Sequence, residues 1–280
     1  MPELPEVERG RRLAQRIAEK RTVVRVFCTD DPIVFAGTSA RRWRRALEGR
    51  RVEAVRRWGK RIWFTLDAAP HPIFHFGMSG GFETPGIAPL SLRTGPRTDK
   101  GEDRWPPRFV KILLRFDDGG ELAMFDARRL GSILLRNDPE NEAPIADLGF
   151  DPLLAMPDPA AFFRLLQHRR RAIKGLLLDQ SFAAGVGNWI ADEALYQAGI
   201  DPRCLASTLT ESRSRRLRSR LLAIVRKAVE VDADSQRYPR TWLFHHRWGR
   251  NPNARSARGE AIEYLNVAGR TTAWVPSAQR

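Results

Sequence analysis

Cysteine, lysine and long apolar runs are scarce in this 280-residue chain. Its two cysteines, Cys28 and Cys204, form no CxxC pair, which argues against a disulfide framework and a cysteine-rich zinc site and favours a reducing, cytosolic compartment. No run reaches about 18 uncharged apolar residues, and the charged start lacks an apolar signal-peptide core, so neither a membrane span nor an export signal is expected. The 42% of hydrophobic residues can still bury the cores of two domains.

Basic residues outnumber acidic ones by 48 to 33, giving a net charge of +15. Such a surface attracts polyanions, and nucleic acid is the first candidate. Only six of the 48 basic residues are lysine, so the arginine excess could also reflect a GC-rich genome; composition alone does not separate the two explanations. The arginines cluster in RRWRR (41–45), RRWGKR (56–61), HRRRAIK (168–174) and RSRRLRSR (213–220).

The residue pattern divides the chain into a β-rich first half and a helical second half. After a first helix, strands are predicted at 22–27, 51–66, 71–78, 108–116, 121–125 and 132–136, with a DDGG turn at 117–120. We therefore expect a β domain over 1–137. A proline-rich, acidic linker follows over 138–158, then a helical domain over 159–237 and a C-terminal segment ending in a β-hairpin over 238–280.

The opening stretch MPELPEVERG permits two interpretations. Proline at the first helical position and glutamate in the first turn are typical of a helix start. If Met1 is removed, however, Pro2 becomes a free secondary amine beside the carboxyl group of Glu3. An α-amino group has a pKa of about 8, so it is partly uncharged and nucleophilic near neutral pH. It could attack a sugar C1′ while Glu3 moves the protons.

Three further stretches could carry chemistry but also have ordinary structural explanations. GVGN at 185–188 could bind a phosphate at a helix start, or could simply be a turn with a capping residue. FHFGMSGG at 74–81 and DARRLG at 126–131 each follow a predicted strand. A lone His75 or Met78 is ordinarily a core residue, and a pair of arginines is ordinarily on the surface.

Taken together, the motifs resemble the formamidopyrimidine-DNA glycosylase and endonuclease VIII family, and Leu4-Pro5 resembles its formamidopyrimidine branch. They occur in the family's order: PELPEVE, GK (59–60), HFGMSG (75–80), DARRLG (126–131), LLLDQSFAAGVGNWIADEALYQAGIDP (176–202) and AGRTTAWVP (268–276). The resemblance implies an α+β fold with an N-terminal β-sandwich, a helix–two-turns–helix domain, a terminal hairpin, and damaged double-stranded DNA bound between the domains.

The resemblance also implies a role for each matching residue. Pro2 would form a Schiff base, Glu3 would be the general acid, Lys60 would belong to the catalytic group and Glu6 would support it. DNA phosphates would be held by Lys60, His75, Asn188 and Arg270. Met78, Arg128 and Leu130 would fill the gap left by the flipped nucleotide, with Arg128 suited to an opposite cytosine. Leu130 stands where phenylalanine is commoner in the family, so weaker stacking is expected.

The C-terminus departs from the family's usual four-cysteine zinc finger. No cysteine follows Cys204, and the positions near the expected ligands are Arg255, Arg258, Val275 and Ala278. We therefore expect neither zinc nor any other cofactor. The hairpin should be held by packing of Tyr264, Trp274 and Val275, as in the zincless finger of plant and fungal relatives.

The stretch at 229–249 resembles the same subgroup and is short where bacterial members carry a longer loop over 8-oxoguanine. Formamidopyrimidines, hydantoins and abasic sites are therefore expected to be better substrates than 8-oxoguanine. We expect a monomer, located at the nucleoid or in a nucleus. The main alternative is a damage-binding protein without catalysis. RNA or ribosome binding explains neither the N-terminus nor the ordered motifs.

Overall fold

A computed structural model describes residues 2–87 and 105–280, and the chain divides after residue 147 into two compact units. We call residues up to 147 unit 1 and residues 148–280 unit 2. The boundary falls inside the stretch expected to be a linker, where residues 137–158 form turns and contribute no helix or strand to the named elements.

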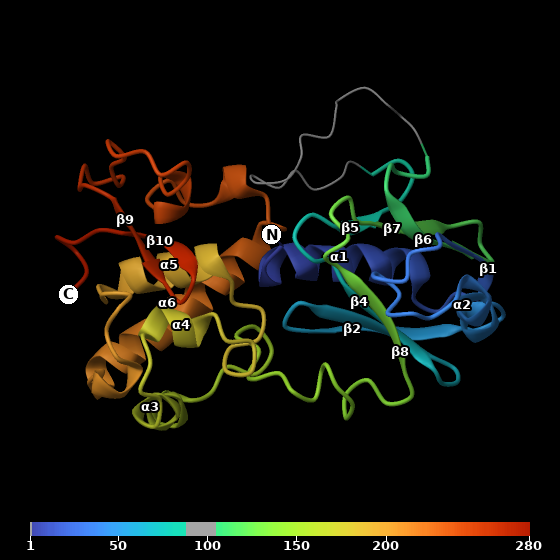
Figure 1. The fold of residues 1–280 in the computed structure, drawn as a ribbon, viewed down its shortest axis with the longest axis horizontal. Coiled ribbons are helices and arrows are strands. Elements are labelled where there is room, and N and C mark those ends of the chain that lie inside the picture. The colour runs from blue at the N-terminus through green and yellow to red at the C-terminus, as the bar shows by residue number, and fades with distance from the viewer. Residues whose placement is uncertain (1, 88–104) are drawn as a thin grey trace. The chain divides into compact units, whose positions relative to one another are not determined.

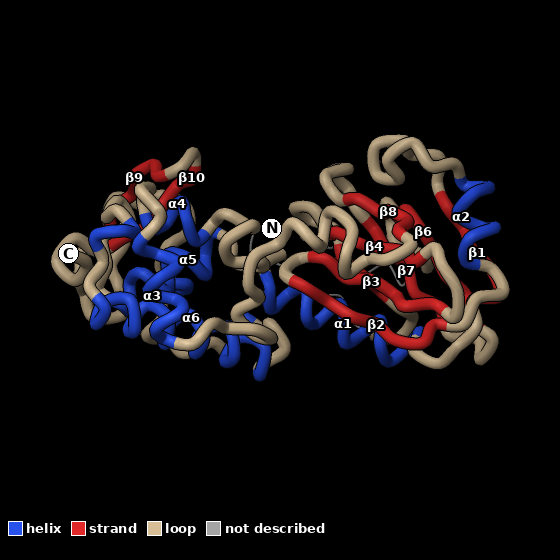
Figure 2. Tube along the Cα trace, turned by 90° about the horizontal axis from the view of Figure 1, so that it is seen from below, coloured by secondary structure: helices blue, strands red, loops and turns tan. Residues whose placement is uncertain are grey.

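Unit 1 contains two four-stranded antiparallel sheets, shown in red in Figure 2. The first has the order β1 (Val23–Cys28), β6 (Val110–Phe116), β7 (Glu121–Phe125), β5 (Gly81–Glu83). The second has the order β2 (Val52–Trp58), β3 (Arg61–Leu66), β4 (His71–His75), β8 (Ser132–Arg136). Aromatic and β-branched side chains on the facing sides drive the sheets together, because each sheet has an apolar face to bury.

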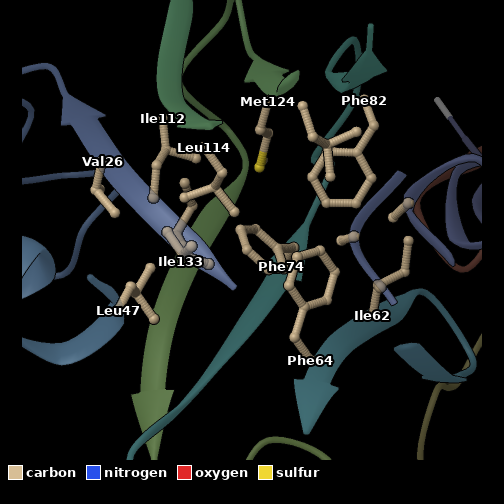
Figure 3. Close-up of a cluster of buried hydrophobic side chains, with 14 of the residues drawn as sticks. Val26, Leu47, Ile62, Phe64, Phe74, Phe82, Ile112, Leu114, Met124 and Ile133 are labelled. Atoms are coloured by element: carbon tan, nitrogen blue, oxygen red, sulfur yellow. The ribbon is translucent and has the colours of Figure 1, made fainter. Parts of the chain in front are cut away.

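The core lies between these sheets (Figure 3). Phe74 on β4 has no exposed surface, and its ring meets that of Phe82 on β5 edge-on with centroids 5.1 Å apart. The ring of Phe64 on β3 has its centroid 5.0 Å from that of Phe74 and 6.2 Å from that of Phe82. The edge-on contact between Phe74 and Phe82 joins the two sheets at the strands that flank the loop carrying Met78.

Helix α1 (Leu4–Ala18) contacts β2 and β5, which are edge strands of different sheets, and so covers one open side of the sandwich. Its buried residues include Val7, Ala14 and Ala18. Helix α2 (Ala40–Leu47) lies against β1 at another edge (Figure 1). Helix α2 is not expected from the sequence, because its four arginines mask a single buried aromatic residue, Trp43, which has no exposed surface. The three-residue strand β5 is likewise not expected from the sequence.

Unit 2 is helical and ends in a hairpin (Figure 1). Its elements are α3 (Pro159–Gln167), α4 (Ile173–Leu177), α5 (Asn188–Ala198), η1 (Ala206–Thr208), α6 (Glu211–Glu230), η2 (Ser235–Arg237), η3 (Leu243–His245), β9 (Glu263–Val267) and β10 (Arg270–Trp274). Helical spacing continues from 159 to 180 in the sequence, but α3 ends at Gln167. The backbone there pairs with another segment instead: Ala206 N donates to Arg171 O at 3.0 Å, and Ala172 bridges to Leu205.

Replacing Gly10 in the middle of α1 tests how tightly this helix packs. A Cβ at that position would lie 2.7 Å from the Phe76 ring. Gly10→Ala should therefore lower the free energy of unfolding by about 1–3 kcal/mol through overpacking, although alanine is the better helix former by about 1 kcal/mol. Chemical denaturation measures the change, with Arg16→Ala on the exposed face as control. Stabilisation by Gly10→Ala would contradict the close packing.

Candidate functional site

The N-terminus of α1 holds two carboxyl groups in a reciprocal cap. Glu3 is the N-cap residue, and its carboxylate accepts a hydrogen bond from the backbone N–H of Glu6. In return, Glu6 Oε2 accepts one from Glu3 N at 2.9 Å. Pro2 is buried and Glu3 is only 2% exposed. The structure thus places the predicted nucleophile and general acid at the positive end of a helix dipole, where a carboxylate is stabilised.

The pKa of Glu6 is raised well above its ordinary value. Burial, and next the neighbouring Glu3 carboxylate, raise the pKa of Glu6 from 4.5 to about 7. Two carboxyl groups this close do not both ionise readily, because like charges repel in a poorly solvated place. Glu6 therefore takes up and releases a proton near neutral pH, at a position that is hydrogen-bonded to the predicted general acid Glu3.

A buried ion pair fixes this helix against the turn that carries Lys60. Arg57 Nε donates to Glu8 Oε2 at 2.9 Å, and the Arg57 side chain has no exposed surface. Arg57 Nη1 also donates to the carbonyl of Gly59 at 2.9 Å. Lys60 follows Gly59 in the turn between β2 and β3 and is half-buried. Glu8 and Arg57 could not be singled out from the sequence, since 49 residues separate them and no local pattern pairs them.

His75 at the end of β4 is held in the neutral form. Burial, then the positive charges of Arg61 and Lys60, lower the pKa of His75 to about 3. The N–H of Gly77 donates to its Nδ1 at 3.3 Å, so the neutral ring carries its proton on Nε2. Lys60 and His75 thus lie close enough to interact electrostatically. Arg61, which was not singled out from the sequence, interacts with His75 in the same way. The group offers a cation and a neutral N–H donor, both suited to phosphate oxygens.

The loops carrying Met78, Arg128 and Leu130 pack backbone to backbone. A Cβ on Gly77 would lie 2.4 Å from Gly131 N, so only glycine permits this approach. Buried Asp126 accepts hydrogen bonds from Gly131 N at 2.6 Å and Arg128 N at 3.1 Å. Met78 is half-buried, whereas Arg128 is exposed and Leu130 is 49% exposed. The two motifs therefore form one platform that leaves Arg128 and Leu130 at the surface.

Asn188 and Arg270 come together in unit 2. Asn188 Nδ2 donates at 3.0 Å to the carbonyl of Thr271, the residue after Arg270. Arg270 is exposed and follows the two-residue turn of the hairpin, where Ala268 and Gly269 have φ of 51° and 74°, as a type I′ turn requires. The loop before α5 is ordered by Gln180, whose Oε1 accepts from Gly185 N at 3.0 Å.

A buried ion cluster joins α4, α5 and the hairpin beneath Asn188. Asp192 has no exposed surface on its side chain and accepts from Lys174 Nζ and Arg247 Nη2, each at 2.5 Å. Lys174 also donates to Thr272 Oγ1 at 2.7 Å, and Ala273 N donates to Asp192 at 3.1 Å. Removing one partner would leave a buried charge, so the cluster fixes the helix start and the hairpin as a single piece.

The hairpin packs on apolar side chains of unit 2. Leu243, Ile262, Ala273 and Val275 form a buried cluster with Tyr196, and Tyr264 packs against it. Trp274 is buried and lies under the guanidinium of Arg203, whose carbon is 4.6 Å from the ring centroid. Among residues 2–87 and 105–280, no three His, Cys, Asp or Glu side chains gather as metal ligands would.

Comparison with known proteins identifies the family of this chain. The formamidopyrimidine-DNA glycosylase N-terminal domain matches residues 1–133, and the formamidopyrimidine-DNA glycosylase H2TH domain matches residues 148–239. A formamidopyrimidine-DNA glycosylase of Arabidopsis thaliana is 39% identical over 100% of this chain and 71% of the relative. The chain belongs to the formamidopyrimidine-DNA glycosylase family. This makes it a DNA glycosylase of base-excision repair.

Solved structures agree with this assignment. The glycosylase aligns with the crystal structure of the MutM (Fpg) protein from Thermus thermophilus at 33% identity and a TM-score of 0.77, over 99% of this chain and 98% of that one. A Lactococcus lactis Fpg mutant in complex with Fapy-dG-containing DNA aligns at 25% identity and a TM-score of 0.80 over 100% of both chains. The α+β fold expected from the sequence is confirmed. Within the described residues, no helix is long and apolar enough to cross a membrane.

The raised pKa of Glu6 predicts a pH-dependent stability. Because the folded-state pKa of about 7 lies above the ordinary 4.5, this group's favourable contribution is fully present below pH 4.5 and is lost as the pH rises through 7. Glu6→Gln keeps the cap acceptor but cannot ionise. Relative to wild type, the variant should gain on the order of 1–3 kcal/mol of unfolding free energy between pH 4.5 and 8.

Urea denaturation at a series of pH values measures this difference. Glu53→Gln is the control, because its hydrogen bond to Lys20 lowers the pKa of Glu53 and the wild-type residue should be favoured as the pH rises. Parallel pH profiles for wild type and Glu6→Gln would contradict the assignment.

Proposed function

We propose that the glycosylase is bifunctional, removing the base and then cleaving the strand as an abasic-site lyase. The Pro2 nitrogen attacks C1′ and loses its proton, and the bond from C1′ to the base breaks as the base takes up a proton. The C1′–O4′ bond then opens with a proton delivered to O4′, which leaves the amine and the sugar joined as an iminium. Loss of the C2′ proton then breaks the C3′–O bond by β-elimination, and a second elimination can release the sugar. Water hydrolyses the remaining imine and frees the amine.

The observation that carries this proposal is the capped pair at α1. Glu3 lies next to Pro2, is 2% exposed and points its carboxylate at the N–H of Glu6. A secondary amine with a carboxyl group beside it supplies both the nucleophile and the proton donor that base departure needs. The amine chemistry requires removal of Met1, which lies outside the residues that the structure describes.

Phosphate binding is proposed for two groups, one in each unit. Lys60 and neutral His75 supply a charge and an N–H donor in unit 1. In unit 2, Arg270 stands exposed at the hairpin turn, and Asn188 begins α5 beside it. Helix starts and arginines are common phosphate ligands, and they position DNA without reading its sequence.

Met78, Arg128 and Leu130 are proposed to occupy the gap left by an extruded nucleotide. Apolar side chains can replace lost stacking, while an arginine offers a rigid pair of donors to the acceptors of an unpaired base. The exposure of Arg128 and of Leu130, which is 49% exposed, supports this assignment, because both must reach DNA.

We further propose that the glycosylase works as a monomer on damaged double-stranded DNA without zinc or another cofactor. The apolar cluster under the hairpin supports the metal-free state, since Val275 and Ala273 are buried in it. The chain also has no cysteine after Cys204 from which a thiolate site could be built.

Borohydride trapping tests the amine chemistry. Protein of verified N-terminal mass is incubated with a duplex containing one abasic site, and an adduct between protein and DNA should form. An N-terminal methionine retained before Pro2 should abolish trapping, because the amine becomes an amide. Glu3→Gln should reduce base excision by at least about 100-fold through loss of the proton donor, whereas Glu53→Gln at a partly exposed position should not. Tight binding by processed protein without any adduct would favour a non-catalytic damage-binding protein.

The short 229–249 segment predicts a substrate order. Single-turnover excision should be faster for a hydantoin or a formamidopyrimidine than for 8-oxoguanine, each placed opposite cytosine in the same duplex. Tyr238 and Phe244 in this segment pack with ring centroids 4.9 Å apart, so it forms a compact aromatic cluster. Equal rates for 8-oxoguanine and a hydantoin would refute the order without affecting the lyase proposal.

A further inference from the structure

Arg129 stands between the two exposed residues proposed to enter DNA, yet none of the functions above uses it. Its Nε donates to Asp31 Oδ2 and its Nη2 to Asp31 Oδ1, both at 3.0 Å. This is a two-pronged contact across 98 residues of sequence, and it joins the loop between β7 and β8 to the segment after β1. We call it the Asp31–Arg129 clamp.

Asp31 is a firm anchor. It is 6% exposed, and it accepts from Lys111 Nζ at 2.8 Å and from the N–H groups of Ile33 and Val34 at 3.2 and 3.3 Å. Burial opposes its ionisation, but the hydrogen bonds from Arg129 and Lys111 hold the pKa of Asp31 well below its ordinary value. An ionised carboxylate that accepts this many hydrogen bonds has little freedom to move. Asp31 therefore holds the Arg129 side chain in place.

The clamp acts where the loop backbone is strained. Arg129 has a φ of 55°, in the left-handed region that a residue with a side chain rarely adopts. Asp126 and the close approach of Gly77 already hold the loop ends at Arg128 N and Gly131. An ion pair from the strained residue itself supplies a reason for an arginine, rather than a glycine, at this position.

We propose that Arg129 is a positioning residue whose clamp on Asp31 sets the arrangement of Arg128 and Leu130 and thereby the selectivity for the base opposite the lesion. This inference rests on the proposed function. A paired contact from arginine to a base edge discriminates between bases by about tenfold to a hundredfold, and it depends on the placement of both donors. A loop released from Asp31 keeps Arg128 but loses that placement.

The test compares single-turnover excision of one lesion opposite cytosine and opposite adenine. The ratio of the two rates does not depend on how much of a preparation is active, so a loss of folded protein leaves it unchanged. Arg129→Gly removes the clamp while relieving the strained φ. Asp31→Asn removes the negative charge and one of the two acceptors of the clamp but leaves Arg129 in place, which separates positioning from direct contact of Arg129 with DNA. Both should lower the ratio about fivefold.

Asp118→Asn is the matched control, because Asp118 pairs with Arg21 elsewhere in unit 1 and its loss should leave the ratio unchanged. Reduced selectivity in Arg129→Gly but not in Asp31→Asn would overturn the clamp in favour of direct contact. Unchanged ratios in both variants would overturn it as well, as would a wild type that excises without discriminating. A wild type that neither excises nor traps would instead refute the proposed function, and the inference would fall with it.

Discussion

The buried ion pair between Glu8 and Arg57 is the constraint on which the geometry of unit 1 depends. Arg57 has no exposed side-chain surface and makes hydrogen bonds both to Glu8 on α1 and to the carbonyl of Gly59. Breaking such a pair leaves an uncompensated buried charge, at a cost of about 3–5 kcal/mol. The helix that carries Pro2 and Glu3 therefore cannot shift without disturbing the turn that carries Lys60.

The remaining site residues of unit 1 are fixed by backbone contacts. Gly77 and Gly131 allow two loops to approach so closely that a single added Cβ would collide. The backbone N–H groups of these loops find acceptors nearby; for example, Gly131 N donates to the carboxylate of Asp126. Rigid loops of this kind can present Arg128 and Leu130 to a partner at a small entropic cost, because little backbone freedom remains to be lost on binding.

Local pattern was sufficient for much of this fold. The helices over Asn188–Ala198 and Glu211–Glu230 follow from helical spacing, and the hairpin turn at 268–269 follows from turn chemistry. The expectation that Asn188 could serve as a capping residue is wrong, because the N-cap is Gly187 and the Asn188 amide donates to the carbonyl of Thr271. Long-range side-chain pairing was not accessible in that way. The folded chain pairs Arg57 with Glu8, Arg129 with Asp31 and Lys174 with Asp192, and residues far apart in sequence supply each pair. In the sequence alone, each of these residues looks like an ordinary charged surface residue.

These pairings change the meaning of the basic composition. Arg57 and Arg247 are buried against carboxylates and stabilise the two units, so the count of 48 basic residues overstates the number of positive groups that face a partner. In contrast, His75 adds no formal charge at neutral pH, since its pKa is lowered to about 3, yet it keeps an N–H donor in the neighbourhood of Lys60. Position and protonation, more than the number of arginines, decide which groups can bind a phosphate. Codon usage can therefore set the arginine content without defining the site.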